Sequence, residues 1–336
     1  MTSANQDPMD MTVRQAFEIY QDRRRRSGAY SPVTIGDSEY TMTKYAAGLW
    51  DRPVASITPQ ECAQLFSELT KIGPVAANRT LCCLRTVFDV ARDCTIDMEG
   101  HSVLLDKGNP VTLMLKSTPF NPVGRRNGRI PIGRVRAVWR ALKELGEHAA
   151  NPATRTAADW LRLRLLTGMR PSESQALRFS HVHLVHNIIE VPPALTKNYR
   201  SLILPMPLQL SDLIEHRRAV YVAEHAGQDV PPEAFIFGSA ASRAGHIMNA
   251  RRALKAVAGP ETTQYDLRRT FWDVAAQCGI DPDVRIRLLN LAARDYGFGR
   301  LRISRGMLLD ALTRIAQWLD QDEGPAASLR GLTVLH

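Results

Sequence analysis

The segment LRLRLLTGMRPSESQALRFS, residues 161–180, decides how the chain is interpreted. Its first half has leucines at helical spacing and ends at Gly168, a residue type that commonly terminates helices. Pro171 suits the first position of a second helix, so Arg170 lies in a tight joint between two helices. A guanidinium fixed at such a joint suits a phosphate ligand, because it offers paired donors and keeps its charge. The alternative is an arginine that only pairs with the nearby carboxylate of Glu173.

The composition is that of a globular protein with an acidic partner. The 336 residues include 43 Lys and Arg against 34 Asp and Glu, a net charge of +9, with a pI near 9.6. This excess indicates a polyanion, nucleic acid before an anionic membrane surface. No apolar run approaches the ~20 residues of a membrane span, and residues 1–10 do not resemble a signal peptide. We therefore expect a cytoplasmic protein.

The N-terminal part predicts an all-α domain. After an expected disordered tail at residues 1–11, four helices follow within residues 12–93, at about 12–22, 34–49, 58–70 and 75–93, and we place this domain at residues 12–95. The run Thr58-Pro59-Gln60-Glu61 is a strong helix start, with Thr as cap and Pro at the first position. An unbroken basic run either faces solvent or follows a backbone of phosphates, and its members are Arg23, Arg24, Arg25 and Arg26.

A linker rich in Pro and Gly, residues 96–130, separates this domain from a second one at residues 131–320, which an expected tail at residues 321–336 follows. Basic residues without an acid begin at the end of the linker, and we select Arg125, Arg126 and Arg129 as candidate DNA contacts. The alternative is a basic helix that faces solvent. The second domain is predicted to be mainly helical, with strands at 187–191 and 201–205 and helices at about 131–146, 155–167, 208–226, 246–258 and 307–319.

Two further cations stand at the ends of predicted elements in the second domain. Lys197 lies near the tip of the hairpin between the two strands. In QYDLRRTFWDVAAQCG, Asp266 is the expected N-cap, which places Arg268 in the first helical turn, where backbone N–H groups also favour phosphate. Two arginines and a lysine from separate elements can neutralise the oxygens of a phosphodiester and protonate a leaving oxygen.

The sequence contains no comparable motif for binding a metal or a nucleotide. The sequence has no Walker A pattern, no HExxH and no acidic metal cluster, so we predict neither a metal nor a cofactor. His181 and His183 alternate as in a strand, and His186 follows nearby, but we interpret the three as surface residues rather than ligands.

With these residues in place, the sequence resembles the tyrosine recombinases, the phage and prophage integrase family. LLTGMRPSE at 165–173 resembles its first arginine motif, TKNYRSLILPMP at 196–207 its lysine hairpin, and YDLRRTF at 265–271 its HxLRRTF box. VRIRLLNL at 284–291 resembles the LGH segment, and ANRTLCCLRTVFDVA at 77–91 the core-binding domain. The resemblance implies a mainly α fold with a small β-sheet, made of an all-α core-binding domain and an α+β catalytic domain that together clamp duplex DNA.

The same resemblance implies a reaction. A tyrosine attacks the scissile phosphate to form a 3′-phosphotyrosyl link, without metal or ATP, while Arg170 and Arg268 bind the phosphate and Lys197 acts as acid. Tyr265 stands where the family usually has His, and no histidine occupies the LGH position. Tyr296 is the tyrosine nearest the nucleophile's expected place, although it comes early, and it is alternatively a packed aromatic residue.

The resemblance leaves three functions open. The first is site-specific DNA integration and recombination, carried on a mobile element by a protein that forms tetramers on DNA through its C-terminal helix and associates with the nucleoid. The second is a catalytically impaired relative that binds DNA for regulation or architecture without cutting it. The third is a topoisomerase-like nicking enzyme, which would need no partner protomers.

Overall fold

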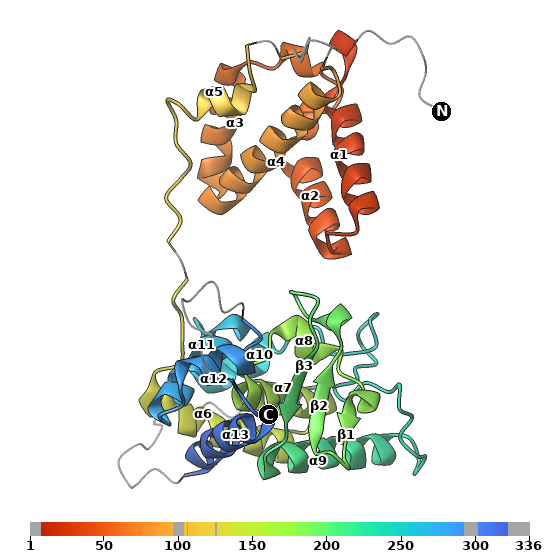
Figure 1. Cartoon of the computed structure of the whole chain (residues 1–336), viewed down its shortest axis with the longest axis vertical. Coiled ribbons are helices and arrows are strands. Elements are labelled where there is room, and N and C mark those ends of the chain that lie inside the picture. The colour runs from red at the N-terminus through yellow and green to blue at the C-terminus, as the bar shows by residue number, and fades with distance from the viewer. Residues whose placement is uncertain (1–7, 97–103, 106, 125, 292–301, 322–336) are drawn as a thin grey trace. The chain divides into compact units, whose positions relative to one another are not determined.

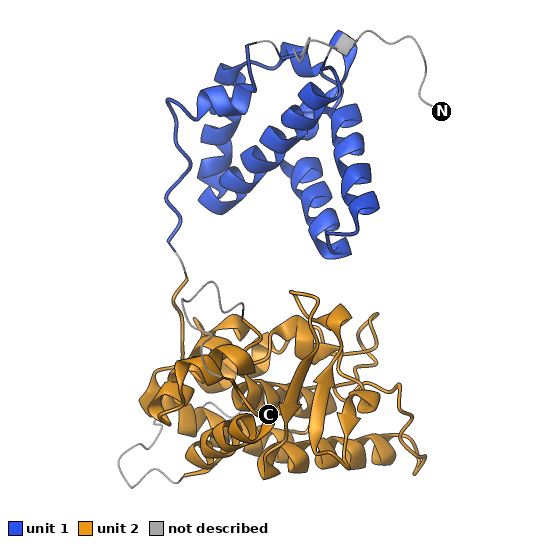
Figure 2. Ribbon diagram, in the orientation of Figure 1, with its two compact units in different colours: residues 1–125 blue, residues 126–336 orange. Residues whose placement is uncertain are grey.

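The computed structural model describes residues 8–96, 104–105, 107–124, 126–291 and 302–321 (Figure 1). The chain divides into two compact units, Met1–Arg125 and Arg126–His336 (Figure 2). Unit 1 is helical in its described residues, and unit 2 combines helices with one small sheet. The predicted fold class, mainly α with a small β-sheet, is therefore confirmed. None of the described helices combines the length and the apolar character needed to cross a membrane.

Unit 1 is built around one long helix, against which the other helices pack. Its helices are α1 (Val13–Ser27), α2 (Pro32–Tyr45), α3 (Pro59–Ile72), the long α4 (Pro74–Asp93) and the short α5 (Pro110–Met114). The predicted start of α3 is confirmed, because the Thr58 hydroxyl accepts the Glu61 N–H and the Glu61 carboxylate accepts the Thr58 N–H. The second helix ends at Tyr45 rather than at residue 49, since residues 47–49 form a separate 3₁₀ turn.

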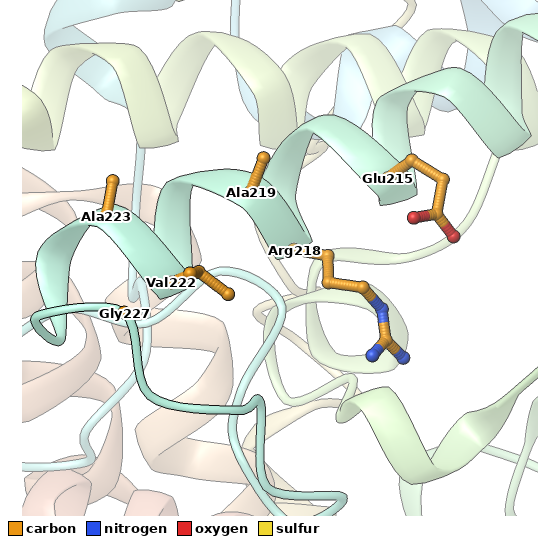
Figure 3. Close-up of a pocket in the computed structure, with 6 residues that line it drawn as sticks. All are labelled: Glu215, Arg218, Ala219, Val222, Ala223 and Gly227. Carbon is orange, nitrogen blue, oxygen red and sulfur yellow. The ribbon is translucent and has the colours of Figure 1, made fainter.

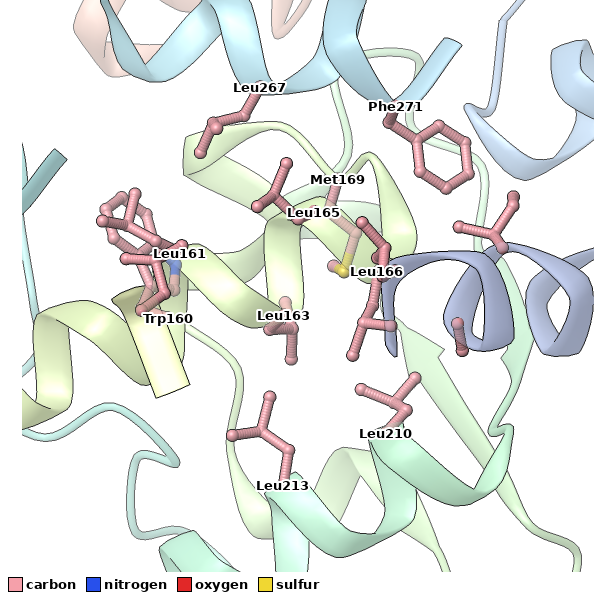
Figure 4. Packing of buried hydrophobic residues seen from close by; sticks show 14 of the residues in the cluster. Trp160, Leu161, Leu163, Leu165, Leu166, Met169, Leu210, Leu213, Leu267 and Phe271 are labelled. Atoms are coloured by element: carbon pink, nitrogen blue, oxygen red, sulfur yellow. The ribbon is translucent and has the colours of Figure 1, made fainter. Parts of the chain in front are cut away.

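Unit 2 surrounds a single buried helix. Its helices are α6 (Ile132–His148), α7 (Pro152–Thr167), α8 (Pro171–Gln175), α9 (Leu208–Glu224), α10 (Arg251–Ala258), α11 (Gln264–Gln277), α12 (Pro282–Leu288) and α13 (Arg305–Asp320). Along α7, Leu161, Leu163, Leu165 and Leu166 are at most 1% exposed. Figure 4 shows these leucines between two pairs of apolar side chains, Leu267 and Phe271 of α11 and Leu210 and Leu213 of α9. Burying each leucine contributes roughly 1.5–3 kcal/mol, so these four side chains anchor α7 in the core of the unit.

The sheet has three antiparallel strands in the order β1-β2-β3, with β1 at Val182–His183, β2 at Ile188–Val191 and β3 at Leu202–Pro205. Ile189 pairs with Val182 on one side and with Leu204 on the other. The sequence predicted β2 and β3 but not β1. The alternation of His181 and His183 was the local signal for β1, in which Val182 pairs with Ile189 and His183 with Ile188.

Two other expectations about unit 2 are wrong. The helix expected at 246–258 begins only at Arg251. The helix that carries Arg268 begins at Gln264, because its N-cap is Thr263 rather than Asp266. Asp266 is the third residue of the helix, and its carboxylate accepts a hydrogen bond from the Thr263 N–H. Arg268 is therefore the fifth residue of α11 and lies beyond its first turn, so the free N–H groups at the helix start do not add to its affinity for phosphate.

A further expectation concerns α13, whose apolar face was expected to dock onto another protomer. Leu308 is 7% exposed, and Leu312 and Ile315 are fully buried, all within the core of unit 2 itself. Asp320 at the end of α13 accepts hydrogen bonds from the Trp139 indole at 2.8 Å and from Gln209 at 2.9 Å. This helix is thus a structural part of its own unit, which counts against its predicted docking role.

Candidate functional site

Arg170 occupies the joint between α7 and α8 and is held by a buried carboxylate. Glu173 is fully buried and accepts two hydrogen bonds from Arg170, one from the backbone N–H at 2.7 Å and one from Nη1 at 2.6 Å. The Arg170 side chain keeps 20% of its surface exposed. The ion pair considered as the alternative therefore exists. It fixes the guanidinium without covering it, and a fixed guanidinium with an exposed edge can still take a phosphate oxygen.

Arg268 reaches the same carboxylate from α11. Its Nη1 lies 3.9 Å from Glu173 Oε2 and donates to the Gly168 carbonyl at 3.0 Å, while its Nη2 donates to the Leu289 carbonyl at 2.5 Å. One buried carboxylate thus holds both predicted arginines. Gly168 permits this approach, because a Cβ there would lie 2.5 Å from Leu289 Cδ2, and its φ of +66° suits glycine.

Both arginines line a cleft of about 410 Å³, together with Arg129, Tyr265, Arg269, Trp272, Asp273, Leu289 and Leu291. The lining residues thus include four guanidinium groups and one carboxylate, and two further carboxylates, Glu173 and Asp266, pair with three of the arginines from behind the lining. Such a surplus of paired N–H donors matches the non-bridging oxygens of a phosphodiester. Tyr265 is 63% exposed, so its hydroxyl is accessible to a bound ligand. Leu291, at the position where the resemblance expects histidine, leaves that part of the cleft wall without a proton acceptor.

Arg164 supports the cleft and was missed from the sequence. It is fully buried in α7, donates from Nη2 to the Gln264 carbonyl at 2.6 Å and from Nε to the Met169 carbonyl at 3.4 Å, and so ties α11 to the joint. Burial lowers its pKa to about 9, while Tyr265 and Glu173 oppose this shift. Arg164 therefore stays charged at neutral pH. The sequence signal for this role was an arginine within the leucine-rich stretch 161–166, because a charged side chain that is buried with apolar neighbours needs hydrogen-bonding partners.

Lys197 is not among the residues that line the cleft. It is exposed in the connection between β2 and β3, next to Asn198, which hydrogen-bonds to Asn290 just after α12. The structure thus brings together Arg170, Tyr265 and Arg268 in one cleft, and Lys197 does not line it. Tyr296, the candidate nucleophile, lies outside the described residues.

The basic run of α1 divides into separate environments. Arg24 is 8% exposed, donates to Ser38 at 2.9 Å, and has the rings of Tyr20 and Tyr30 over its guanidinium, so we remove it from the candidate DNA contacts. Its neighbours are exposed, with Arg23 donating to Cys94 Sγ, Arg25 pairing with Asp22, and Arg26 on the surface.

The linker arginines also differ from one another. Arg126 is exposed, whereas Arg129 pairs with Asp273 at 3.0 Å while it lines the cleft. Arg125 lies outside the described residues.

Two other features of unit 2, a hollow on α9 and the histidines around β1, show no comparable cluster of functional groups. A hollow of about 470 Å³ on α9 is lined mostly by small or apolar residues, with Glu215 and Arg218 at one end (Figure 3). His181 Nδ1 accepts the Arg178 backbone N–H, and His183 lies 3.4 Å from Glu190. Among the described residues, no three His, Cys, Asp or Glu side chains gather as metal ligands.

Comparisons with known proteins show which fold the chain shares with solved structures. No family model matches the sequence, and no curated protein does. Among solved structures, a lambda integrase dimer bound to a COC′ core site matches with a TM-score of 0.60 and 15% identity, over 88% of this chain and 100% of that one. A lambda integrase tetramer bound to a Holliday junction has a TM-score of 0.60 and 15% identity, over 90% and 86% of the two chains.

A third solved structure gives the same result. The Tn1549 transposon integrase in complex with circular intermediate DNA has a TM-score of 0.57 and 16% identity, over 90% of this chain and 95% of that one. At such identities the similarity shows a common fold, and it extends over both units.

Proposed function

We propose that this chain is a DNA-binding protein of the tyrosine recombinase family that carries out site-specific integration and recombination. The observation that carries the proposal is the convergence of Arg170 and Arg268 on the buried carboxylate of Glu173, at the wall of an arginine-rich cleft. The fold shared with integrases whose structures contain DNA supports the same function. The chain's net charge of +9 agrees with a polyanionic partner.

In the proposed reaction, a DNA phosphate enters the cleft and its non-bridging oxygens meet the two guanidinium groups. The phenolic oxygen of Tyr296 attacks phosphorus, the bond to the 5′-oxygen breaks, and Lys197 gives that oxygen a proton. The phenolic proton passes to water, because Leu291 accepts no proton and the phenol of Tyr265 is a poor base. The 3′-phosphotyrosyl bond conserves the energy of the phosphodiester, so a 5′-hydroxyl can reverse the step.

The partner is double-stranded DNA, and we propose that several copies of the chain act together on it. The lambda integrase structures on DNA, one a dimer and one a tetramer, support this assembly. Because α13 is buried in its own unit, we do not assign the contact between copies to that helix. A mobile-element origin and an association with the nucleoid belong to the same proposal.

A second candidate function is DNA binding without cleavage. The observation that favours it is the cleft wall, where Leu289 and Leu291 line the space and the described lining residues include no histidine. Without a histidine at this wall, cleavage lacks the base that the resemblance expects, while phosphate binding by Arg170 and Arg268 is unaffected.

A covalent-capture experiment separates the two functions. The protein is incubated with nicked duplexes of randomised central sequence, denatured, and examined for a DNA adduct on a gel. An adduct that disappears in Tyr296→Phe but persists in the matched variant Tyr265→Phe supports recombination. Loss in Tyr265→Phe alone would transfer the nucleophile to Tyr265. A protein that binds duplex DNA but forms no adduct has the second function.

A further inference from the structure

Two asparagines connect the lysine-bearing segment to the arginine cleft. The Asn198 amide donates to Asn290 Oδ1 at 3.0 Å, and the Asn290 amide donates back to Asn198 Oδ1 at 3.2 Å. Asn290 Nδ2 also lies 3.3 Å from the Arg200 carbonyl, and Asn198 Nδ2 lies 3.3 Å from the Asn290 carbonyl. Three polar contacts thus join Asn198 to Asn290, 92 positions away in the chain, and a fourth joins Asn290 to Arg200.

The backbone of Asn290 is suited to this role. It follows the last turn of α12 with a φ of +48°, and the next N–H, of Leu291, bonds back to Ile286 at 3.0 Å, which closes the helix end. Asparagine is one of the few residues besides glycine that adopt this conformation readily. Glycine would close the helix equally well, but it has no amide to reach Asn198. Asn290 is 6% exposed, so its polar atoms need these partners.

The segment that carries Lys197 is fixed on both sides. Before Lys197, Thr196 is 4% exposed and its hydroxyl bonds to the Arg200 carbonyl at 2.9 Å. After Lys197 comes Asn198, held by Asn290. The loop is therefore closed on itself by Thr196 and attached to unit 2 by Asn290, while the exposed Lys197 projects from between these two anchors.

The other end of this connection is the arginine cleft. Leu289, directly before Asn290, accepts a hydrogen bond from Arg268 at 2.5 Å through its carbonyl. Two consecutive residues after α12 thus contact the phosphate-binding arginine and the lysine segment. A displacement of this turn changes the position of Lys197 relative to Arg268.

We propose that the Asn198–Asn290 amide pair is a clasp that positions Lys197 for proton transfer at the cleft. This inference rests on the proposed function, in which Lys197 is the acid. Asn198 and Asn290 are positioning residues and touch no substrate.

Limited trypsin digestion tests the clasp without DNA. Lys197 and Arg200 are both exposed trypsin sites inside the clasped segment. Asn290→Gly keeps the positive φ and removes the side-chain amide, so three side-chain hydrogen bonds are lost. Cleavage after Lys197 and Arg200 is therefore expected to become roughly tenfold faster. Asn198→Ala is expected to do the same, and the double variant is expected to be no faster than either single one.

The matched control is Asn187→Gly. Asn187 also has a positive φ, +51°, but its side chain bonds to the Met206 carbonyl and to Ser211 instead of the lysine segment. The control should leave cleavage after Lys197 and Arg200 at the wild-type rate. Equal rates in Asn290→Gly and the wild type overturn the clasp, whatever the protein does to DNA.

A second measurement tests whether the clasp acts through Lys197. The captured duplex is prepared with sulfur in place of the 5′-bridging oxygen, since a thiolate leaves without needing a proton. Asn290→Gly and Lys197→Ala are both expected to form adduct more slowly on the oxygen substrate and at the wild-type rate on the sulfur substrate. Slowing on both substrates contradicts a positioning role and indicates general damage. If the wild type forms no adduct on either duplex, the proposed cleavage fails, and the trypsin result still decides the clasp.

Discussion

Replacing Gly168 with alanine is the substitution whose cost the structure defines most sharply. Gly168 has a φ of +66°, and an added Cβ would lie 2.5 Å from Leu289 Cδ2 and 2.6 Å from Phe271 Cδ1. The left-handed backbone costs about 1 kcal/mol with a side chain present. Overpacking against two buried side chains adds about 1–3 kcal/mol. We expect Gly168→Ala to lower the free energy of unfolding of unit 2 by roughly 2–4 kcal/mol in total.

Scanning calorimetry measures this effect, and a second glycine gives the control. For a unit of this size the expected fall in Tm is roughly 4–16 °C. Gly279 also has a positive φ, +68°, but a Cβ there would meet only the flexible end of Arg314 at 3.3 Å. Gly279→Ala should therefore cost about 1 kcal/mol, from the backbone alone. Equal losses of Tm in the two variants would refute the argument that Gly168 is required by close packing around the Arg268 contact.

Three further predictions concern individual side chains. Glu173→Gln leaves Arg170 and Arg268 without the buried negative charge that they share. This substitution should lower the free energy of unfolding, measured in urea, by about 3–5 kcal/mol. A loss below about 1 kcal/mol would contradict the description of Glu173 as the shared carboxylate. Leu291→His places an imidazole at the cleft wall and should accelerate adduct formation with a pH dependence near 6.5, whereas an unchanged pH profile would remove Leu291 from the reaction site. Hydrogen bonds from the Arg52 side chain and the Thr58 backbone lower the pKa of Glu61 to about 2, so the stability that this carboxylate gives unit 1 is present above pH 4.5 and is lost as the pH falls toward 2. The difference between wild type and Glu61→Gln in urea unfolding should therefore vanish at the acid end, and a difference that persists there would be inconsistent with the lowered pKa.

The parts of the site that local sequence decides were predictable. Gly168 and Pro171 define the joint that presents Arg170, and strands on either side of the loop place Lys197 in the connection between β2 and β3. The start of α11 was also readable, since Thr263 and Asp266 have capping-box spacing, but Asp266 alone was taken as the cap.

What remained hidden depends on contacts between distant residues. Arg24 is as basic as its neighbours in α1, and only the rings of Tyr20 and Tyr30 and the hydroxyl of Ser38 remove it from the surface. The pairing of Asn198 with Asn290 spans 92 positions and leaves no local pattern.

The salt dependence of duplex DNA binding tests the central claim, that the arginine cleft holds a DNA phosphate. The comparison is between Glu173→Gln and the double variant Arg170→Gln/Glu173→Gln, so that neither protein keeps an unpaired buried carboxylate. The control is Arg155→Gln, in the first turn of α7 and therefore at the opposite end of that helix from Gly168. We predict that losing Arg170 makes the negative slope of log K against log salt shallower by about 0.9, the value for one phosphate contact. The Arg155→Gln control should keep the wild-type slope. Identical slopes with and without Arg170 would contradict the account.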